Sequence, residues 1–133
     1  MELRGANVVV TGAGSGIGAA LARALAEAGA ARLWLADLAA DGVEAVAAEL
    51  GAAATAVACD VSDEAAVSDL VARASADAPL DLFCANAGIA TGAGLEAPTE
   101  QWERIWAVNV LAHVYAARAC LPQWIERGSG HLL

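Results

Sequence analysis

The stretch Thr11-Gly12-Ala13-Gly14-Ser15-Gly16-Ile17-Gly18 decides the fold. Before it, residues 7–11 form a β-branched run that is typical of a strand buried on both faces. After it, apolar residues recur every four positions over residues 17–28, which predicts a helix that ends at Gly29. Glycines between a strand and a helix let the backbone approach a phosphate group, and the amides at the helix start can bind that group. A flexible alanine–glycine loop is the alternative interpretation.

The rest of the chain alternates short apolar runs with helical patterns. Further strands are predicted over residues 33–37, 55–59 and 81–85. Helices are predicted over residues 41–50, after an N-cap at Ser62, and from a cap at Thr99 to residue 127 with a bend at Pro122. A glycine-rich loop covers residues 88–97. Strands that alternate with helices predict an α/β fold, a doubly wound parallel sheet in one domain of residues 1–133.

Composition and charge exclude several classes of function. The net charge of −9 would repel a phosphate-rich polymer, so nucleic-acid binding is not expected. The longest uncharged apolar run, residues 105–117, is shorter than the roughly 20 residues of a membrane span. The three cysteines lie scattered in apolar segments, at Cys59, Cys84 and Cys120. They predict buried free thiols in a cytoplasmic protein, and neither they nor the two histidines form a metal-binding pattern.

Asp37 indicates what kind of ligand the glycine turn would hold. It ends the predicted second strand, about 20 residues after the glycine cluster, where a carboxylate can accept hydrogen bonds from both ribose hydroxyls. The same negative charge would repel a 2′-phosphate, which favours NAD over NADP as the cofactor. A solvated aspartate at the end of a strand is the alternative.

Four motifs together resemble those of the short-chain dehydrogenases/reductases, over residues 7–133. The glycine turn reads Thr-Gly-x-x-x-Gly-x-Gly, and Asp60-Val61 is similar to the pair that contacts adenine in this family. Cys84-Ala85-Asn86-Ala87-Gly88 is similar to the family's Asn-Asn-Ala-Gly motif, with Ala85 in place of the first Asn. Val108-Asn109-Val110-Leu111-Ala112 places Asn109 where the family has an asparagine that supports the catalytic lysine through a water molecule.

The resemblance implies a Rossmann-like sheet of strand order 3-2-1-4-5 that lacks its C-terminal strands. It also implies an NAD-dependent oxidoreductase that transfers a hydride between NAD and a small alcohol or carbonyl substrate. Because the family packs the 99–127 helix against a second subunit, a homo-oligomer through this helix is expected. The cofactor-binding residues implied in this way are Gly12, Ser15, Gly16, Ile17, Gly18, Asp37, Leu38, Asp60, Val61, Asn86, Ala87 and Gly88.

Structural alternatives stay open for several of these residues. Asp60 could N-cap the next turn, Ser15 could cap the first helix, and Asn86 could tie two strand ends together. Asn109 could make a structural hydrogen bond inside its apolar helix. Apolar residues at helical spacing around Asn109 are expected to pack rather than to form a cofactor site, namely Trp102, Ile105, Trp106 and Val110.

The family's main catalytic groups are not found in these residues. In the family, a serine follows the fifth strand, and a Tyr-x-x-x-Lys pair on the next helix exchanges a proton with the substrate. Tyr115 is the one tyrosine, Ala119 stands four positions later, and the sequence contains no lysine. Ser129 precedes the last three residues, which resemble the opening of the fifth strand. We therefore expect an N-terminal portion that is inactive alone, with Asn109 in a supporting role. The alternative is a non-catalytic fragment that binds nucleotides or self-assembles.

Overall fold

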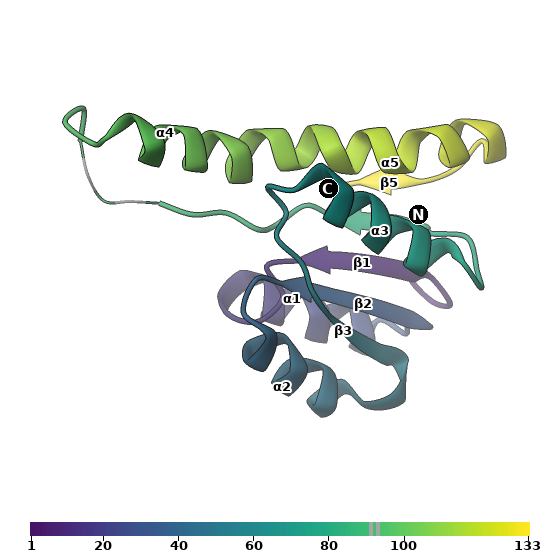
Figure 1. Ribbon diagram of the computed structural model, residues 1–133. Coiled ribbons are helices and arrows are strands. Elements are labelled where there is room, and N and C mark those ends of the chain that lie inside the picture. Colours follow the sequence, from purple (N-terminus) through teal and green to yellow (C-terminus); the bar gives the residue numbers. More distant parts are fainter. Residues whose placement is uncertain (91, 93) are drawn as a thin grey trace.

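A parallel five-stranded sheet forms the centre of the computed structural model, which describes residues 1–90, 92 and 94–133 (Figure 1). The strands are β1 (Asn7–Thr11), β2 (Arg32–Asp37), β3 (Ala54–Ala58), β4 (Leu82–Cys84) and β5 (His131–Leu132). Their order is β3-β2-β1-β4-β5, and neighbouring strands run parallel. The predicted sheet and its strand order are thus confirmed. The predicted loop at 88–97 includes positions 91 and 93, which lie outside the described residues.

Helices cover both faces of the sheet, with α1 and α2 on one face and α3 and α5 on the other (Figure 1). The helices are α1 (Gly16–Glu27), α2 (Ala40–Leu50), α3 (Glu64–Ser75), α4 (Thr99–Trp106) and α5 (Ala112–Arg127). A short 3-10 helix, Gly51–Ala53, follows α2, and a π-helical segment, Ala107–Leu111, joins α4 to α5. Among the described residues, no helix combines the length and apolarity needed to cross a membrane.

The central strand β1 is buried at every position. Val8 and Val10 pack in a core with residues of α1 and α2, whereas Val9 packs in a second core with residues of α3 and α5. Since successive side chains of a strand point to opposite faces, a strand covered on both faces needs apolar residues throughout. This explains the unbroken β-branched run that precedes the glycine turn.

Two predicted helix caps are wrong by one residue. Helix α3 is capped by Asp63, whose carboxylate accepts the backbone N–H of Ala65 at 2.9 Å, and not by Ser62. The Ser62 hydroxyl instead donates to Asp60 at 2.7 Å, so it is already used. Helix α4 is preceded by an extended Pro98, with φ −55° and ψ 149°, so that Thr99 is its first helical residue rather than its cap.

The helix predicted over 99–127 exists as one run made of α4, the π-helical segment and α5. The run continues through Pro122 to Arg127, where Gly128 ends it in the left-handed conformation at φ 71°. Its departure from α-helical geometry lies at Ala107–Leu111, well before the proline. π-helical insertions are frequent at functional sites, and this one contains Asn109.

Candidate functional site

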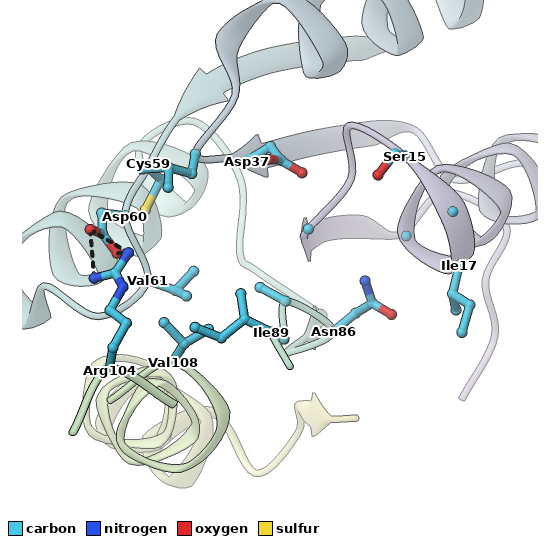
Figure 2. A pocket seen from close by; sticks show the side chains of 16 residues that line it. Ser15, Ile17, Asp37, Cys59, Asp60, Val61, Asn86, Ile89, Arg104 and Val108 are labelled. Carbon is cyan, nitrogen blue, oxygen red and sulfur yellow. Dashed lines mark hydrogen bonds and ion pairs between the residues drawn. The ribbon is translucent and has the colours of Figure 1, made fainter. Parts of the chain in front are cut away.

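The carboxyl ends of the strands border a cavity of about 390 Å³ (Figure 2). In a parallel doubly wound sheet, this edge is where ligands bind. The cavity is lined by every residue that the sequence predicted to bind the cofactor, from Gly12 to Gly88. It is also lined by residues that the sequence reasoning missed, namely Cys59, Ile89, Arg104 and Val108. The topology has therefore brought motifs that lie far apart in the chain to a single place.

The glycine turn lies against the segment after β4 so closely that Gly12 and Gly18 have no room for a side chain. A Cβ on Gly12 would lie 2.9 Å from the Cα of Ala87, and Gly12 has φ +67°. A Cβ on Gly18 would overlap the carbonyl oxygen of Gly12 and lie 2.7 Å from the Nδ2 of Asn86. This close packing holds the start of α1 at the cavity, where its backbone amides can meet an anion.

Ser15 stands at the N-cap position of α1, but its side chain makes no capping hydrogen bond there. The backbone carbonyl of Ser15 accepts the N–H of Ala19 at 3.1 Å, as expected of an N-cap residue. Of the two roles predicted for Ser15, the side-chain cap is thus not observed, and the hydroxyl lies on the lining of the cavity.

The Asp37 carboxylate is fixed by backbone donors on both of its oxygens. Oδ2 accepts the N–H of Gly14 at 2.9 Å, and Oδ1 accepts the N–H of Ala39 at 3.0 Å. Asp37 therefore differs from a freely solvated strand-end aspartate. A carboxylate oxygen can accept more than one hydrogen bond, so both oxygens can still accept a ligand hydroxyl. Leu38, beside it, is exposed at the cavity.

Asp60 is held by two elements. Its Oδ1 accepts the backbone N–H of Ser62 at 3.0 Å and the Ser62 hydroxyl at 2.7 Å, while Arg104 of α4 reaches its Oδ2 at 3.2 Å. Burial by itself would raise the pKa of Asp60, but the hydrogen bonds from Ser62 and the guanidinium of Arg104 lower it below its ordinary value. Asp60 thus closes a local turn as an ionised carboxylate, while Asp63 caps helix α3.

Asn86 ties the ends of β1 and β4 together. Its Nδ2 donates to the carbonyl oxygen of Thr11 at 3.0 Å, and its backbone N–H donates to the Thr11 hydroxyl at 3.1 Å. The N–H of Ala87 donates to the same hydroxyl at 3.1 Å. The structural alternative for Asn86 is therefore observed, and Asn86 still lines the cavity.

Asn109 lies outside the cavity lining, and its side chain forms two hydrogen bonds with the backbone of Ile89. Its Oδ1 accepts the N–H of Ile89 at 2.9 Å, and its Nδ2 donates to the carbonyl oxygen of Ile89 at 2.8 Å. The alternative of a structural hydrogen bond is thus observed for Asn109. The contact also positions Ile89, which lines the cavity.

The apolar residues of α4 and of the π-helical segment after it are not all packed within this chain. Trp102 and Trp106 are exposed, and Ile105 and Val110 are only partly buried. Val108 is the buried residue of this stretch, and it lines the cavity. Helical spacing correctly indicates an apolar face, but it does not say whether the same chain covers that face.

The three cysteines are buried free thiols, as predicted. Burial raises the pKa of Cys59 and of Cys84 to about 11 and that of Cys120 to about 12. These thiols therefore stay protonated and unreactive near neutral pH. Among the described residues, no group of His, Cys, Asp and Glu side chains could hold a metal ion.

Comparisons with known proteins agree with the geometry. The family model described as short chain dehydrogenase matches residues 6–133. The 1-deoxy-11-beta-hydroxypentalenate dehydrogenase of Streptomyces avermitilis is 40% identical over an alignment of 135 positions, which covers 96% of this chain and 50% of that protein. The galactitol 2-dehydrogenase (L-tagatose-forming) of Cereibacter sphaeroides is 41% identical over an alignment of 134 positions, which covers 99% of this chain and 52% of that protein. The chain spans about half the length of these curated relatives.

Solved structures share the fold and carry nicotinamide cofactors. The 3-ketoacyl-(acyl-carrier-protein) reductase of Brucella melitensis, complexed with NADH, matches with a TM-score of 0.86 and 38% identity, over 95% of this chain and 53% of that one. A Beutenbergia cavernae protein, described as an NAD(P) dependent gluconate 5-dehydrogenase with bound NADP at low occupancy, matches with a TM-score of 0.88 and 34% identity. That match covers 98% of this chain and 53% of the other.

Proposed function

The chain belongs to the short-chain dehydrogenase family, and we propose that it forms the NAD-binding portion of an oxidoreductase acting on an alcohol or carbonyl compound. One observation carries this proposal: every residue implied in cofactor binding lines the same cavity at the carboxyl edge of the sheet. When bound there, NAD would supply or accept the hydride.

The start of α1 would hold the pyrophosphate. Gly16, Ile17 and Gly18 line the cavity at the positive end of the helix dipole, where backbone N–H groups lack intrahelical partners. Gly16 and Gly18 carry no side chains, so that a phosphate can approach the backbone amides at the start of α1. The net charge of −9 does not prevent this, since backbone donors act at short range.

Asp37 would bind the adenosine ribose and favour NAD over NADP. Its carboxylate is oriented by Gly14 and Ala39 before any ligand arrives, so little ordering is needed on binding. A 2′-phosphate would face this fixed negative charge. Relatives carry either NADH or NADP, so the preference rests on the residues of this chain.

Asp60 and Val61 would border the adenine. An ionised carboxylate can only accept hydrogen bonds, so Asp60 suits the exocyclic amino group of adenine. Val61 is buried beside it and offers apolar contact on the cavity lining. Figure 2 shows Ile17 on the opposite side of the cavity from Asp60 and Val61, and its side chain is exposed.

Residues 1–133 would bind the cofactor without turning it over. The sequence has no lysine, so no Tyr-x-x-x-Lys pair is present among these residues. Asn109 would keep a positioning role through Ile89. We expect no reduction of NAD by this chain alone with any alcohol, as monitored by absorbance of the reduced nicotinamide.

The apolar face of α5 would form a homo-oligomer. Val114, Leu121 and Ile125 are exposed large apolar residues, and they line a groove with Ala117 and Pro122. Contiguous exposed apolar surface of this kind is typical of subunit contacts. This proposal also accounts for the apolar faces that the chain leaves uncovered.

Calorimetry with NAD and NADP tests the cofactor site. Replacing Asp37 by Ala removes charged hydrogen bonds worth about 1.5–3 kcal/mol, so NAD affinity should fall roughly 10- to 100-fold while NADP affinity is kept or improved. Asp77→Ala is the matched control, because Asp77 is an exposed carboxylate far from the cavity lining. It pairs with Arg32, which begins β2, whereas Asp37 ends that strand. Equal weakening of NAD and NADP would contradict the ribose role, and absence of ADP binding by the folded parent would contradict the site.

A further inference from the structure

Arg104 alone carries a positive charge among the described residues that line the cavity. It comes from α4, across the cavity from the glycine turn, and its guanidinium lies beside Asp60 (Figure 2). Nη1 and Nη2 each lie 3.2 Å from the Oδ2 of Asp60, and Nη1 also donates to the hydroxyl of Ser62. The three side chains therefore form one closed hydrogen-bonded cluster at the cavity rim.

Each oxygen of the Asp60 carboxylate is mainly held by a different part of the chain. Oδ1 is held by Ser62, two residues along the chain, through its N–H at 3.0 Å and its hydroxyl at 2.7 Å, and Nη2 of Arg104 adds a longer contact at 3.4 Å. Oδ2 is held by Arg104, 44 residues away on α4. With only the Ser62 contacts, the carboxylate could pivot about Oδ1. The contact from α4 is what removes this freedom.

The ion pair between Arg104 and Asp60 contributes little to stability by itself. The two side chains are 43% and 36% exposed. Exposed ion pairs stabilise folded proteins only weakly, because water screens them and two long side chains lose freedom. The main consequence of the pair is therefore the orientation and charge of Asp60, a residue on the lining of the cavity.

We propose that Arg104 is a positioning residue for adenine recognition, which holds the Asp60 carboxylate as a fixed acceptor for the exocyclic amino group. The inference rests on the proposed function, because it requires an adenine nucleotide in the cavity. The chemistry sets a clear specificity. Adenine presents an N–H donor to Asp60, whereas hypoxanthine presents a carbonyl oxygen in the same place, which an ionised carboxylate repels.

Calorimetric titration of the 133-residue chain with ADP and with inosine diphosphate tests the role of Arg104. Arg104→Met keeps the aliphatic stem but removes the donors, so ADP affinity should fall about two- to fivefold. The affinity for inosine diphosphate should not fall, so the preference for ADP shrinks. Arg104→Lys, which keeps the charge without the planar fork, should restore part of the preference.

Arg23→Met is the matched control. Arg23 lies on α1 and pairs with Glu49 of α2 at 2.6 Å, so the variant loses the same charge from a similar exposed ion pair. Arg23 does not belong to the cavity lining. The preference for ADP in this variant should equal that of the parent chain.

A double-mutant cycle separates positioning from a general effect. In an Asp60→Ala background, Arg104→Met should cause no further loss of ADP affinity. An undiminished loss there, equal weakening of both nucleotides, or tighter ADP binding by Arg104→Met would each overturn the inference while leaving the cofactor site intact. If the folded parent binds no ADP, the proposed function falls and the inference falls with it. Should Arg104→Met fail to fold, Arg104→Lys carries the same comparison.

Discussion

The substitution Gly18→Ala tests whether backbone packing, rather than helix propensity, controls the glycine turn. Gly18 lies inside α1, where intrinsic propensity alone would make alanine about 1 kcal/mol more stable than glycine. The structure predicts the opposite result. An added Cβ would overlap the carbonyl oxygen of Gly12 and lie 2.6 Å from its carbonyl carbon.

The expected loss of stability depends on which atoms the added Cβ meets, and these are backbone atoms of Gly12. Overpacking of a folded interior costs typically 1–3 kcal/mol, and the upper end applies where rigid backbone must move rather than a flexible side chain. The start of α1 would have to move away from the backbone that follows β1. We expect a loss of about 3 kcal/mol, which for a chain of this size lowers the Tm by roughly 10 °C.

Gly16→Ala is the control, because it places alanine in an unfavourable backbone conformation without crowding neighbouring atoms. A Cβ on Gly16 would meet nothing within 4 Å, but its φ of +53° is unfavourable for alanine. The expected cost is about 1 kcal/mol, or a few degrees in Tm. Thermal unfolding followed by circular dichroism, together with urea titration, compares the two variants. If Gly18→Ala is at least as stable as the parent, or if Gly16→Ala loses more, the reasoning about close approach is refuted.

Further predictions concern the thiols and the loop after β4. The thiols of Cys59, Cys84 and Cys120 should react with Ellman's reagent at pH 8 only after denaturation, and fast labelling of the native chain would contradict their burial. Because their pKa values are raised to about 11–12, the unfolded chain ionises first, so stability should fall as the pH rises above about 9. Asn109→Leu removes two hydrogen bonds to Ile89 and should cost about 1–2 kcal/mol, with faster amide exchange at Ile89; unchanged exchange would count against this contact.

The glycine turn and the sheet could be predicted from the sequence because their rules are local or topological. A buried strand, a run of glycines and an apolar helix face each leave a short-range pattern around residues 7–28. Asp37 was expected at the site from its place at the end of the second strand, whereas Asp60 and Asn86 were implied by the family resemblance. The parallel topology brings all three strand ends to one cavity. All three residues line the cavity.

The residues that the sequence reasoning missed lie where long-range packing decides. Arg104 and Val108 are four residues apart, so one helix face carries both, but no local signal says that this face meets the cavity. The predicted cap of α3 was wrong for a related reason. Ser62 and Asp63 are both good caps, and the bond from Ser62 to Asp60 decided between them.

The polar side chains of the cavity bind partners before they can bind a ligand. Asp37 is held by the glycine turn, Asn86 by Thr11 at the end of β1, and Asp60 by both Ser62 and Arg104. Each of these contacts also joins two segments of the fold. A substitution in the cavity therefore changes ligand geometry and local stability together. Comparison of two ligands on one variant, such as NAD with NADP or ADP with inosine diphosphate, separates the two effects, because a loss of stability weakens both ligands equally.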